Sequence, residues 1–212
     1  DYMLAEVNAF LRRPVTRADI VWSYSGVRPL FEVGGGRDND LSTLTRDYSF
    51  EIDAPEGAPP VLTVFGGKLT THRKLAEHAM KELHGLRGWS DVCRTRTEVL
   101  PGGDFGAAGK ASYEATVRKR FPWLPEAQVA RYVQQYGTRV ENLLSGVNIA
   151  SDLGECFGAD LYQREVDFLV STEWAEAPDD VIWRRTKVGL RLSQGEIGRL
   201  RGYLAALNEG AV

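Results

Sequence analysis

The stretch that decides the fold is Val61-Leu-Thr-Val-Phe-Gly-Gly-Lys-Leu-Thr-Thr71, which runs into His72-Arg-Lys-Leu-Ala-Glu-His-Ala-Met-Lys-Glu-Leu83. Its first five residues are apolar, β-branched or aromatic and are typical of a strand. Two glycines follow, and then Leu75, Ala79 and Leu83 recur at a helical spacing. The sequence therefore predicts a strand, a glycine turn and a helix, with Thr70 or Thr71 as the helix cap.

The turn has the chemistry of a binding site for negative charge. Glycines before a helix N-terminus let the backbone approach a ligand closely, and the helix dipole favours an anion there. Lys68 adds a full positive charge. The segment from Gly66 to Thr70 is therefore predicted to bind an anion or an electron-rich ring. The alternative interpretation is a purely structural corner with a solvated lysine.

The composition is ordinary for a soluble globular protein, with 212 residues of which 43% are hydrophobic and 26% charged. A net charge of −3 without a long basic run argues against a nucleic-acid partner. No apolar run reaches the ~20 residues that span a bilayer. Cys93 and Cys156 lie far apart without a CxxC spacing, which argues against a zinc site and favours a reducing compartment.

The first half of the chain is predicted to be helix, three strands and helix. The expected elements are a helix from Tyr2 that ends near Arg12-Arg13-Pro14, strands at Ile20–Val27, Leu44–Ile52 and Val61–Phe65, and a helix at His72–Leu83. Gly34–Asp40 is interpreted as a loop, because it lacks the GxGxxG spacing of a dinucleotide site. The chain starts without Met in a helical pattern, which indicates a fragment.

Three cations lie at strand ends or in strand-like segments of this half. Arg28 precedes Pro29, which stiffens the backbone, and Arg46 and Lys68 follow along the chain. These three side chains can converge on one phosphate, with the arginines binding in a fork and the lysine acting as a point charge. For Arg28 the alternative is a surface ion pair. We find no nucleophile or carboxylate dyad, and the three histidines are interpreted as surface or packing residues.

The second half is predicted to be all helical after a glycine-rich boundary at residues 98–109. The expected helices are Tyr113–Phe121 capped by Ser112, Glu126–Tyr136 closed by Gly137, Arg139–Leu144, Ala159–Thr172, Val181–Arg191 with Asp179 and Asp180 at its start, and Glu196–Asn208. We therefore predict an α+β fold, with residues 1–98 as one part and residues 99–212 as an all-α domain.

Six stretches of the chain also form a recognisable series. They are Trp22-Ser-Tyr-Ser-Gly-Val-Arg-Pro-Leu30, Thr45-Arg-Asp-Tyr48, Val64-Phe-Gly-Gly-Lys-Leu-Thr-Thr-His-Arg-Lys-Leu-Ala-Glu77, Leu100-Pro-Gly-Gly103, Ser151-Asp-Leu-Gly-Glu155 and Trp183-Arg-Arg-Thr-Lys-Val-Gly-Leu190. In this order they closely resemble the FAD-dependent glycerol-3-phosphate dehydrogenase family over essentially the whole chain. Residue 72 is often Tyr in that family and His here, so we assign it no role.

The resemblance implies that the chain is the C-terminal part of a longer enzyme. Residues 1–98 would be the remnant of a substrate-binding sheet and the last strand–turn–helix of a flavin-binding domain, and residues 99–212 the family's helical domain. The Rossmann GxGxxG that holds FAD in the family is missing here, as is the portion with a catalytic histidine. The resemblance therefore implies that this piece alone is inactive, and no catalytic residue is assigned within it.

For the whole enzyme, the resemblance implies oxidation of sn-glycerol 3-phosphate to dihydroxyacetone phosphate, with hydride transfer to FAD and electrons passed to quinone. Arg28 and Arg46 would bind the substrate, and Lys68 would lie between substrate and flavin. The backbone of Gly66, Gly67, Lys68, Leu69 and Thr70 would face the flavin. The family resemblance also implies a cytoplasmic protein held peripherally on the inner face of the membrane, and it allows a homodimer.

Three rival interpretations remain open at this stage. A glycerol-3-phosphate oxidase would use oxygen in place of quinone and shares the same motifs. A non-catalytic helical module would serve docking or dimerisation. An amine or amino-acid oxidase of the same flavin superfamily fits less well. Its substrates carry carboxylates, and the Val-Arg-Pro and Thr-Arg-Asp-Tyr motifs match the glycerophosphate branch better.

Overall fold

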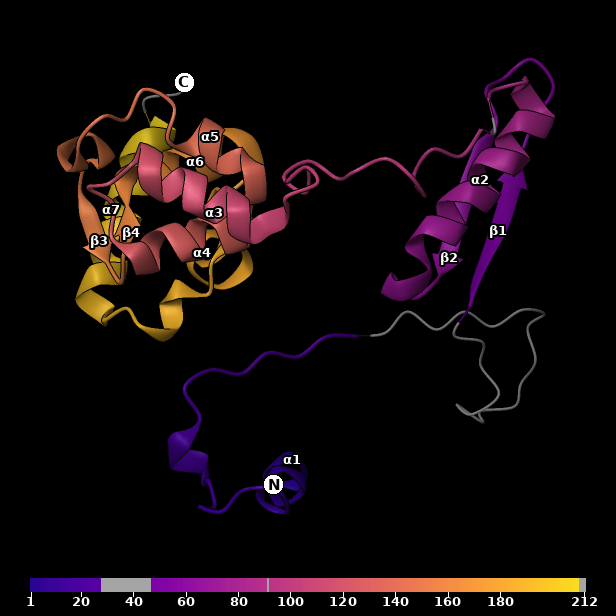
Figure 1. Ribbon diagram of the computed structural model, residues 1–212. Coiled ribbons are helices and arrows are strands. Elements are labelled where there is room, and N and C mark those ends of the chain that lie inside the picture. The colour runs from indigo at the N-terminus through magenta and orange to yellow at the C-terminus, as the bar shows by residue number, and fades with distance from the viewer. Residues whose placement is uncertain (28–46, 91, 210–212) are drawn as a thin grey trace. The chain divides into compact units, whose positions relative to one another are not determined.

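The computed structural model describes residues 1–27, 47–90 and 92–209 (Figure 1). The fold is α+β, as predicted, with helices predominating and two small antiparallel sheets. The chain divides into two compact units, one made of residues 1–22 and 99–212 and the other of residues 23–98. We call them the helical unit and the hairpin unit.

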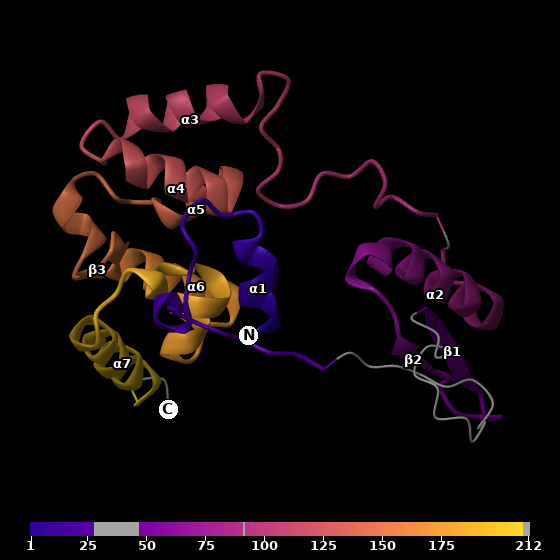
Figure 2. The ribbon, with the colours of Figure 1, turned by 90° about the horizontal axis from the view of Figure 1, so that it is seen from below.

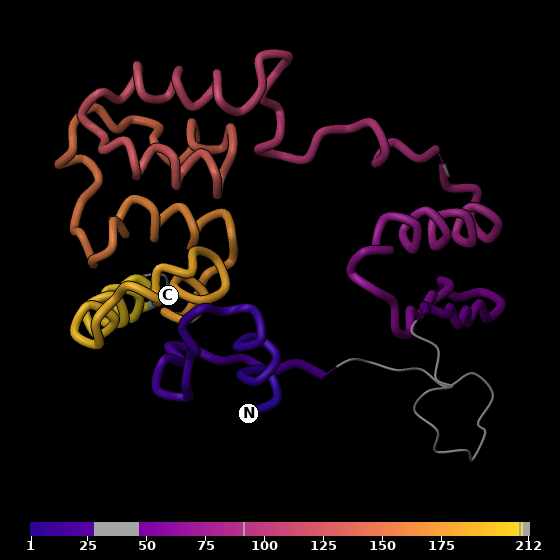
Figure 3. Tube along the Cα trace, turned by 60° about the horizontal axis from the view of Figure 1, so that its bottom comes forward, coloured from indigo at the N-terminus to yellow at the C-terminus, as the bar shows by residue number. Residues whose placement is uncertain are grey.

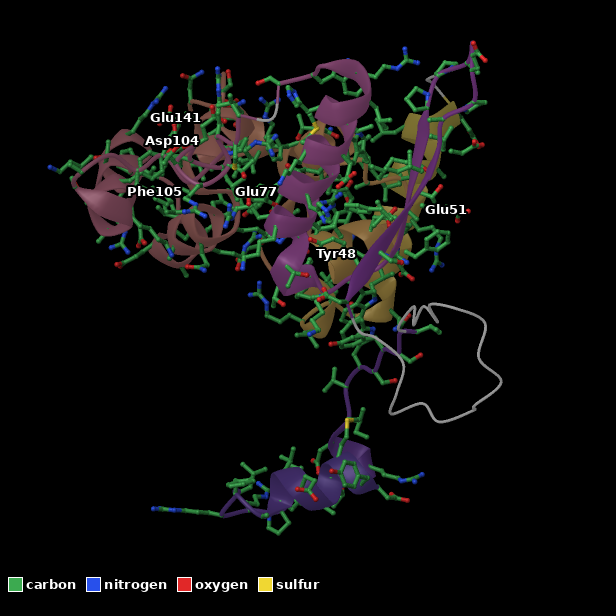
Figure 4. All side chains as sticks on the ribbon, turned by 90° about the vertical axis from the view of Figure 1, so that its right-hand side faces the viewer. Tyr48, Glu51, Glu77, Asp104, Phe105 and Glu141 are labelled. Atoms are coloured by element: carbon green, nitrogen blue, oxygen red, sulfur yellow. The ribbon has the colours of Figure 1, made fainter. Side chains whose placement is uncertain are left out.

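The hairpin unit contains β1 (Tyr48–Asp53), β2 (Val61–Gly66) and α2 (His72–Arg87). The strands pair antiparallel, with Phe50 opposite Val64 and Tyr48 opposite Gly66. The rings of Tyr48 and Phe50 both contact the imidazole of His78 on α2, so this face of the hairpin lies against the helix (Figure 4). The predicted strand at 61–65 and the helix after it are confirmed.

Thr71 occupies the predicted N-cap position of α2, but its side chain does not make the expected capping hydrogen bond. A 3₁₀ turn at Leu69–Thr71 precedes the helix, and the hydroxyl of Thr71 donates back to the carbonyl of Lys68 at 3.0 Å. Short Ser and Thr side chains in a helical turn often bond to a carbonyl three or four residues earlier, which removes them from capping. At its other end, α2 stops at Gly88, whose φ of 66° is the left-handed conformation that glycine adopts easily.

The helical unit opens with α1 (Tyr2–Asn8) and a 3₁₀ turn η1 (Arg17–Asp19). Its main body contains α3 (Gly109–Arg120), α4 (Glu126–Tyr136), η3 (Gly137–Arg139), α5 (Val140–Leu143), η4 (Ala150–Leu153), β3 (Cys156–Gly158), β4 (Leu161–Tyr162), α6 (Gln163–Glu173), η5 (Asp180–Arg185), η6 (Val188–Leu190) and α7 (Gln194–Glu209). Helices α3 and α4 lie side by side (Figure 2), and α7 lies beside β3 (Figure 3). The buried apolar side chains of the described chain all come from residues 117–204.

Several sequence expectations need correction in the helical unit. Helix α3 begins at Gly109, so Ser112 lies inside it and is not its cap. The domain is not purely helical, because β3 and β4 form a short hairpin. Its two turn residues, Ala159 and Asp160, both have positive φ, as a two-residue hairpin with the right-handed strand twist requires.

The helix expected at Val181–Arg191 is broken into two short turns. Residues 180–185 form a π-helical turn, and Lys187 then adopts φ of 62° before the 3₁₀ turn η6. The carboxylate of Asp180 accepts hydrogen bonds from the N–H groups of Glu176 and Ala177 at 3.0 and 2.9 Å. These bonds hold the pKa of Asp180 below its usual value. Asp180 therefore binds backbone N–H groups at the start of this segment, although the segment after it is not a regular helix.

The strand predicted at Ile20–Val27 is also absent. Its β-branched and aromatic residues favour an extended chain, but a strand forms only where a neighbouring strand accepts its hydrogen bonds. Within the described residues β1 pairs with β2 and β3 with β4, and neither sheet includes residues 20–27. The predicted helix at the start of the chain is shorter than expected and ends at Asn8.

Two glycines fix the entry into the helical body. The N–H of Thr138 donates to the carbonyl of Gly102 at 3.0 Å, which draws the loop after Pro101 onto the end of α4. A Cβ on Gly137 would lie 1.7 Å from that carbonyl oxygen, and a Cβ on Gly102 would lie 2.7 Å from the carbonyl oxygen of Tyr136. Both positions also have positive φ. Only glycine fits at either place.

A buried carboxylate ties α4 to α6. Glu165 is fully buried, and its two oxygens each accept a hydrogen bond of 2.7 Å from the guanidinium of Arg131. The hydroxyl of Tyr136 donates to the same carboxylate at 2.6 Å. Burial, together with this carboxylate, raises the pKa of Tyr136 well above its usual value. Arg131 also donates to the carbonyl of Asp160 at 2.7 Å, which links the network to the β3–β4 turn.

We predict that Glu165→Gln destabilises the helical unit by about 3–5 kcal/mol, because it leaves a buried guanidinium without its counter-charge. Urea unfolding followed by circular dichroism measures the change. The control is Arg191→Ala, which removes an exposed pair with Asp160 and is expected to cost less than about 1 kcal/mol. Equal effects of the two substitutions would contradict the importance of the buried pair.

Candidate functional site

The candidate site is the turn between β2 and α2, where five of the seven predicted site residues lie. These are Gly66, Gly67, Lys68, Leu69 and Thr70. The other two, Arg28 and Arg46, lie outside the described residues, so their expected convergence with Lys68 stays a prediction. The assignment of all seven to substrate or cofactor likewise stays a prediction.

The two glycines give the turn a backbone path that other residues rarely adopt. Gly66 has φ of 71° and Gly67 has φ of 101°. A Cβ on Gly67 would lie 3.1 Å from the side chain of Leu75 and 3.5 Å from Cβ of Tyr48. The bare backbone thus packs closely against the first turns of α2 and the start of β1. This explains why the sequence places a glycine there, whether or not a ligand binds.

Lys68 and Leu69 extend from this turn into the solvent. Lys68 is exposed, and within the described ranges its ammonium group has no ion-pair or hydrogen-bond partner. Leu69 is 87% exposed. The first N–H groups of a helical turn have no acceptor within the helix. Positive charge, free N–H groups and exposed apolar surface therefore meet at one end of α2.

The three histidines near the site have structural surroundings, as predicted. The Nδ1 of His72 is 2.7 Å from the carbonyl oxygen of Leu69, and His84 contacts the carbonyl of Trp89 in the same way. His78 packs on the hairpin and pairs with Glu82 through its Nε2 at 3.2 Å. His72 thus bonds to the backbone of the glycine turn, and we assign none of the three histidines a catalytic role.

A hollow in the hairpin unit lies between α2 and the segment that follows this helix. It encloses about 230 Å³ and is lined by Ala76, Glu77, Met80, Ser90, Val92, Cys93, Arg94 and Thr95. The thiol of Cys93 donates to Oε1 of Glu77, which Figure 4 labels on α2, at 2.8 Å, and Arg73 pairs with the same carboxylate. The hydrogen bond from the Cys93 thiol lowers the pKa of Glu77, and the nearby arginines lower it further by a smaller amount.

The described ranges hold no group of three or more His, Cys, Asp or Glu side chains that could bind a metal ion. None of the helices in these ranges is long and apolar enough to cross a bilayer.

We predict that Gly67→Ala destabilises the hairpin unit by about 1–3 kcal/mol, because alanine cannot adopt φ near 101° without strain and its Cβ crowds Leu75. Amide hydrogen exchange of the β1–β2 ladder measures the effect separately from the helical unit. Gly85→Ala is the matched control. It lies within α2 with nothing within 4 Å of its Cβ, so it is expected to stabilise the unit by about 0.5–1 kcal/mol. Equal protection in both variants would contradict the packing described for the turn.

Comparison with known proteins identifies the helical half. Residues 93–197 match the family described as the C-terminal domain of alpha-glycerophosphate oxidase. This range contains α3 to η6 and the start of α7.

Relatives of known name match nearly the whole chain. A glycerol-3-phosphate dehydrogenase of Pseudomonas aeruginosa is 43% identical over 96% of this chain and 39% of its own length. The aerobic glycerol-3-phosphate dehydrogenase of Escherichia coli is 40% identical over 96% of the chain and 40% of its own length. A D-erythritol 1-phosphate dehydrogenase of Brucella abortus is 39% identical over 92% of the chain and 38% of its own length.

The chain thus spans about two fifths of the length of these curated relatives. The resemblance inferred from the six motifs is confirmed: nearly the whole chain is similar to glycerol-3-phosphate dehydrogenases, and residues 93–197 match the C-terminal domain of alpha-glycerophosphate oxidase.

Proposed function

We propose that this chain forms the C-terminal part of an FAD-dependent enzyme that oxidises sn-glycerol 3-phosphate to dihydroxyacetone phosphate. The observation that carries the proposal is the identity of 40–43% to two glycerol-3-phosphate dehydrogenases over 96% of the chain. Residues 1–98 then contribute to the substrate and flavin sites, and residues 99–212 form the helical domain. We propose that the chain alone does not catalyse the reaction, since its described residues lack a GxGxxG turn.

The hairpin unit has the character expected of a part of a larger sheet. None of its described side chains is fully buried, and α2 has no buried residue. Val61, Leu69 and Trp89 are 58%, 87% and 55% exposed. A two-stranded hairpin with one helix buries too little apolar surface to be stable on its own. These features support a unit that is completed by further sheet and by a ligand.

In this proposal, the cations of the hairpin unit bind the substrate. Arg28 and Arg46 hold the phosphate and oxygens of glycerol 3-phosphate, because planar guanidinium groups match a phosphate in a fork. Lys68 adds positive charge next to the reacting end of the substrate. Its exposed position and its lack of a partner among the described residues support this role.

The glycine turn suits the flavin of the proposed enzyme. Gly67 allows the backbone to approach a flat ligand, and the N–H groups of Leu69 and Thr70 at the start of the helical turn can donate to a carbonyl edge. The chemistry that FAD supplies when bound is acceptance of a hydride from the carbon being oxidised. The helix end and Lys68 then stabilise negative charge next to the ring.

The electron acceptor separates two versions of the proposal. We favour a quinone, as expected for a dehydrogenase. Oxygen is the alternative, and it is supported by the match of residues 93–197 to a domain of alpha-glycerophosphate oxidase. Measuring reduction of a quinone analogue against oxygen consumption in the flavin-loaded enzyme distinguishes them. A purely docking role for the helical domain would be favoured if neither acceptor is reduced.

The substrate needs a direct test, because one relative of similar identity is a D-erythritol 1-phosphate dehydrogenase. Both substrates are polyol phosphates, so the same cations can bind either phosphate. We propose glycerol 3-phosphate as the better substrate. A higher kcat/KM for D-erythritol 1-phosphate would overturn that choice while leaving the reaction class intact.

We also propose that the enzyme is cytoplasmic and attaches peripherally to the inner face of the membrane. The support within this chain is the exposed apolar surface around α1, where Tyr2, Met3 and Phe10 are 78%, 77% and 88% exposed next to two arginines. Such a mixture of apolar and basic surface suits an anionic membrane. The homodimer allowed by the resemblance stays a prediction.

We predict that Arg28→Ala and Lys68→Ala in the flavin-bound enzyme each raise KM for glycerol 3-phosphate by roughly ten- to a hundredfold, the usual effect of losing a charge-assisted hydrogen bond. Steady-state kinetics with varied substrate measure the effect. Lys74→Ala is the control, because this exposed lysine lies on α2 outside the turn. Unchanged kinetics in Arg28→Ala would remove the assignment of that residue.

A further inference from the structure

Within the described residues, a contact between side chains, and not a sheet, holds the segment before Arg28. Residues 20–27 lie outside the two sheets of the described chain. Trp22, however, stacks on Trp183 of η5 with ring centroids 4.9 Å apart and an angle of 3° between the planes. The two residues belong to the same compact unit. The N-terminal segment is therefore attached to the helical body through an aromatic pair.

A lysine completes this cluster. The ammonium group of Lys187 lies over the ring of Trp22, 4.9 Å from its centroid, and also donates to the carbonyl of Trp183. A cation over an indole face is favourable, and Trp is the best partner for it. The same ammonium thus contacts both members of the stack. We call Trp22, Trp183 and Lys187 the tryptophan clamp.

The backbone around the clamp is shaped for it. Lys187 adopts φ of 62°, which is costly for a residue with a side chain. A Cβ on Gly189 would lie 2.8 to 2.9 Å from three ring atoms of Trp183, so only glycine leaves room for the indole. Two local backbone constraints therefore converge on the position of one ring, which also packs against the core.

The platform beneath the ring is rigid. Val181 and Ile182, which precede Trp183 in the π-helical turn, are fully buried. The hydroxyl and the N–H of Thr186 both donate to the carbonyl of Val181, at 2.7 and 3.0 Å. Trp183 is thus presented on a fixed turn, while Trp22 comes from a segment without regular structure.

We propose that Trp183 and Lys187 are positioning residues that hold Trp22 and thereby anchor the start of the segment that leads to Arg28. The inference rests on the proposed function in one respect: Arg28, the proposed phosphate ligand, follows Trp22 by six residues in the sequence. Six residues span at most about 20 Å, so anchoring Trp22 restricts where the next part of the chain can lie. The helical domain would then influence substrate binding through the position of Trp22.

The first test follows the clamp itself and needs no activity. Trp22→Ala and Trp183→Ala remove one ring each, and Trp22 lies outside the core, so its loss leaves the domain folded. Chymotryptic cleavage after Tyr24, quantified by mass spectrometry, is expected to accelerate at least roughly fivefold in both variants, because the segment is released. Trp183→Phe keeps a ring and is expected to restore slow cleavage. Trp174→Ala is the matched control, since Trp174 is 87% exposed.

The second test uses the flavin-bound enzyme. Trp22→Ala and Trp183→Ala are expected to raise KM for glycerol 3-phosphate roughly fivefold to tenfold with kcat nearly unchanged, and Trp183→Phe to restore KM. Unaltered cleavage in Trp22→Ala and Trp183→Ala would overturn the clamp. Faster cleavage with an unchanged KM would overturn its role in substrate binding. An enzyme that does not oxidise glycerol 3-phosphate, but whose segment is released by both substitutions, would refute the proposed function and support the clamp.

Discussion

The buried carboxylate of Glu165 is the constraint on which the helical unit depends. A carboxylate without contact to water is unfavourable unless its charge and its lone pairs are matched, and here Arg131 and Tyr136 match them. The pair joins α4 to α6 and, through the carbonyl of Asp160, also holds the β3–β4 turn. The hairpin unit has no such anchor among its described residues and no fully buried side chain. The stable part of the chain is therefore distinct from the part that carries Lys68.

Sequence predicted the elements whose signals are local. The strand and helix around the glycine turn, and α4 with its stop at Gly137, follow from hydrophobic period and glycine positions alone. The prediction of a strand at Ile20–Val27 was wrong, because β-propensity describes one segment and does not show whether a partner strand lies beside it. The Ala159–Asp160 turn was missed because it lacks the Asn-Gly or Asp-Gly signature of such hairpins. The π-helical turn at 180–185 adds one residue per turn, which a 3.6-residue pattern does not reveal.

The site divides in the same way. Gly67 and Lys68 could be selected from sequence because glycines before a helix and an adjacent cation form a recognisable combination. The aromatic pair of Trp22 and Trp183 could not, since nothing in either stretch indicates which distant ring it stacks on. The need for glycine at position 189 is equally invisible until the ring of Trp183 is placed. Long-range contacts between irregular segments leave no periodicity in the sequence.

Gly102 and Gly137 are linked in evolutionary terms. In most packed pairs, a larger side chain at one position can be offset by a smaller one at the other. Here neither residue has a side chain that could become smaller. A Cβ on Gly137 would collide with the backbone of Gly102, and a Cβ on Gly102 would collide with the carbonyl oxygen of Tyr136. No exchange at one position can compensate for a change at the other. Both are therefore expected to remain glycine while the surrounding core drifts, and together they mark where this domain begins in distant sequences.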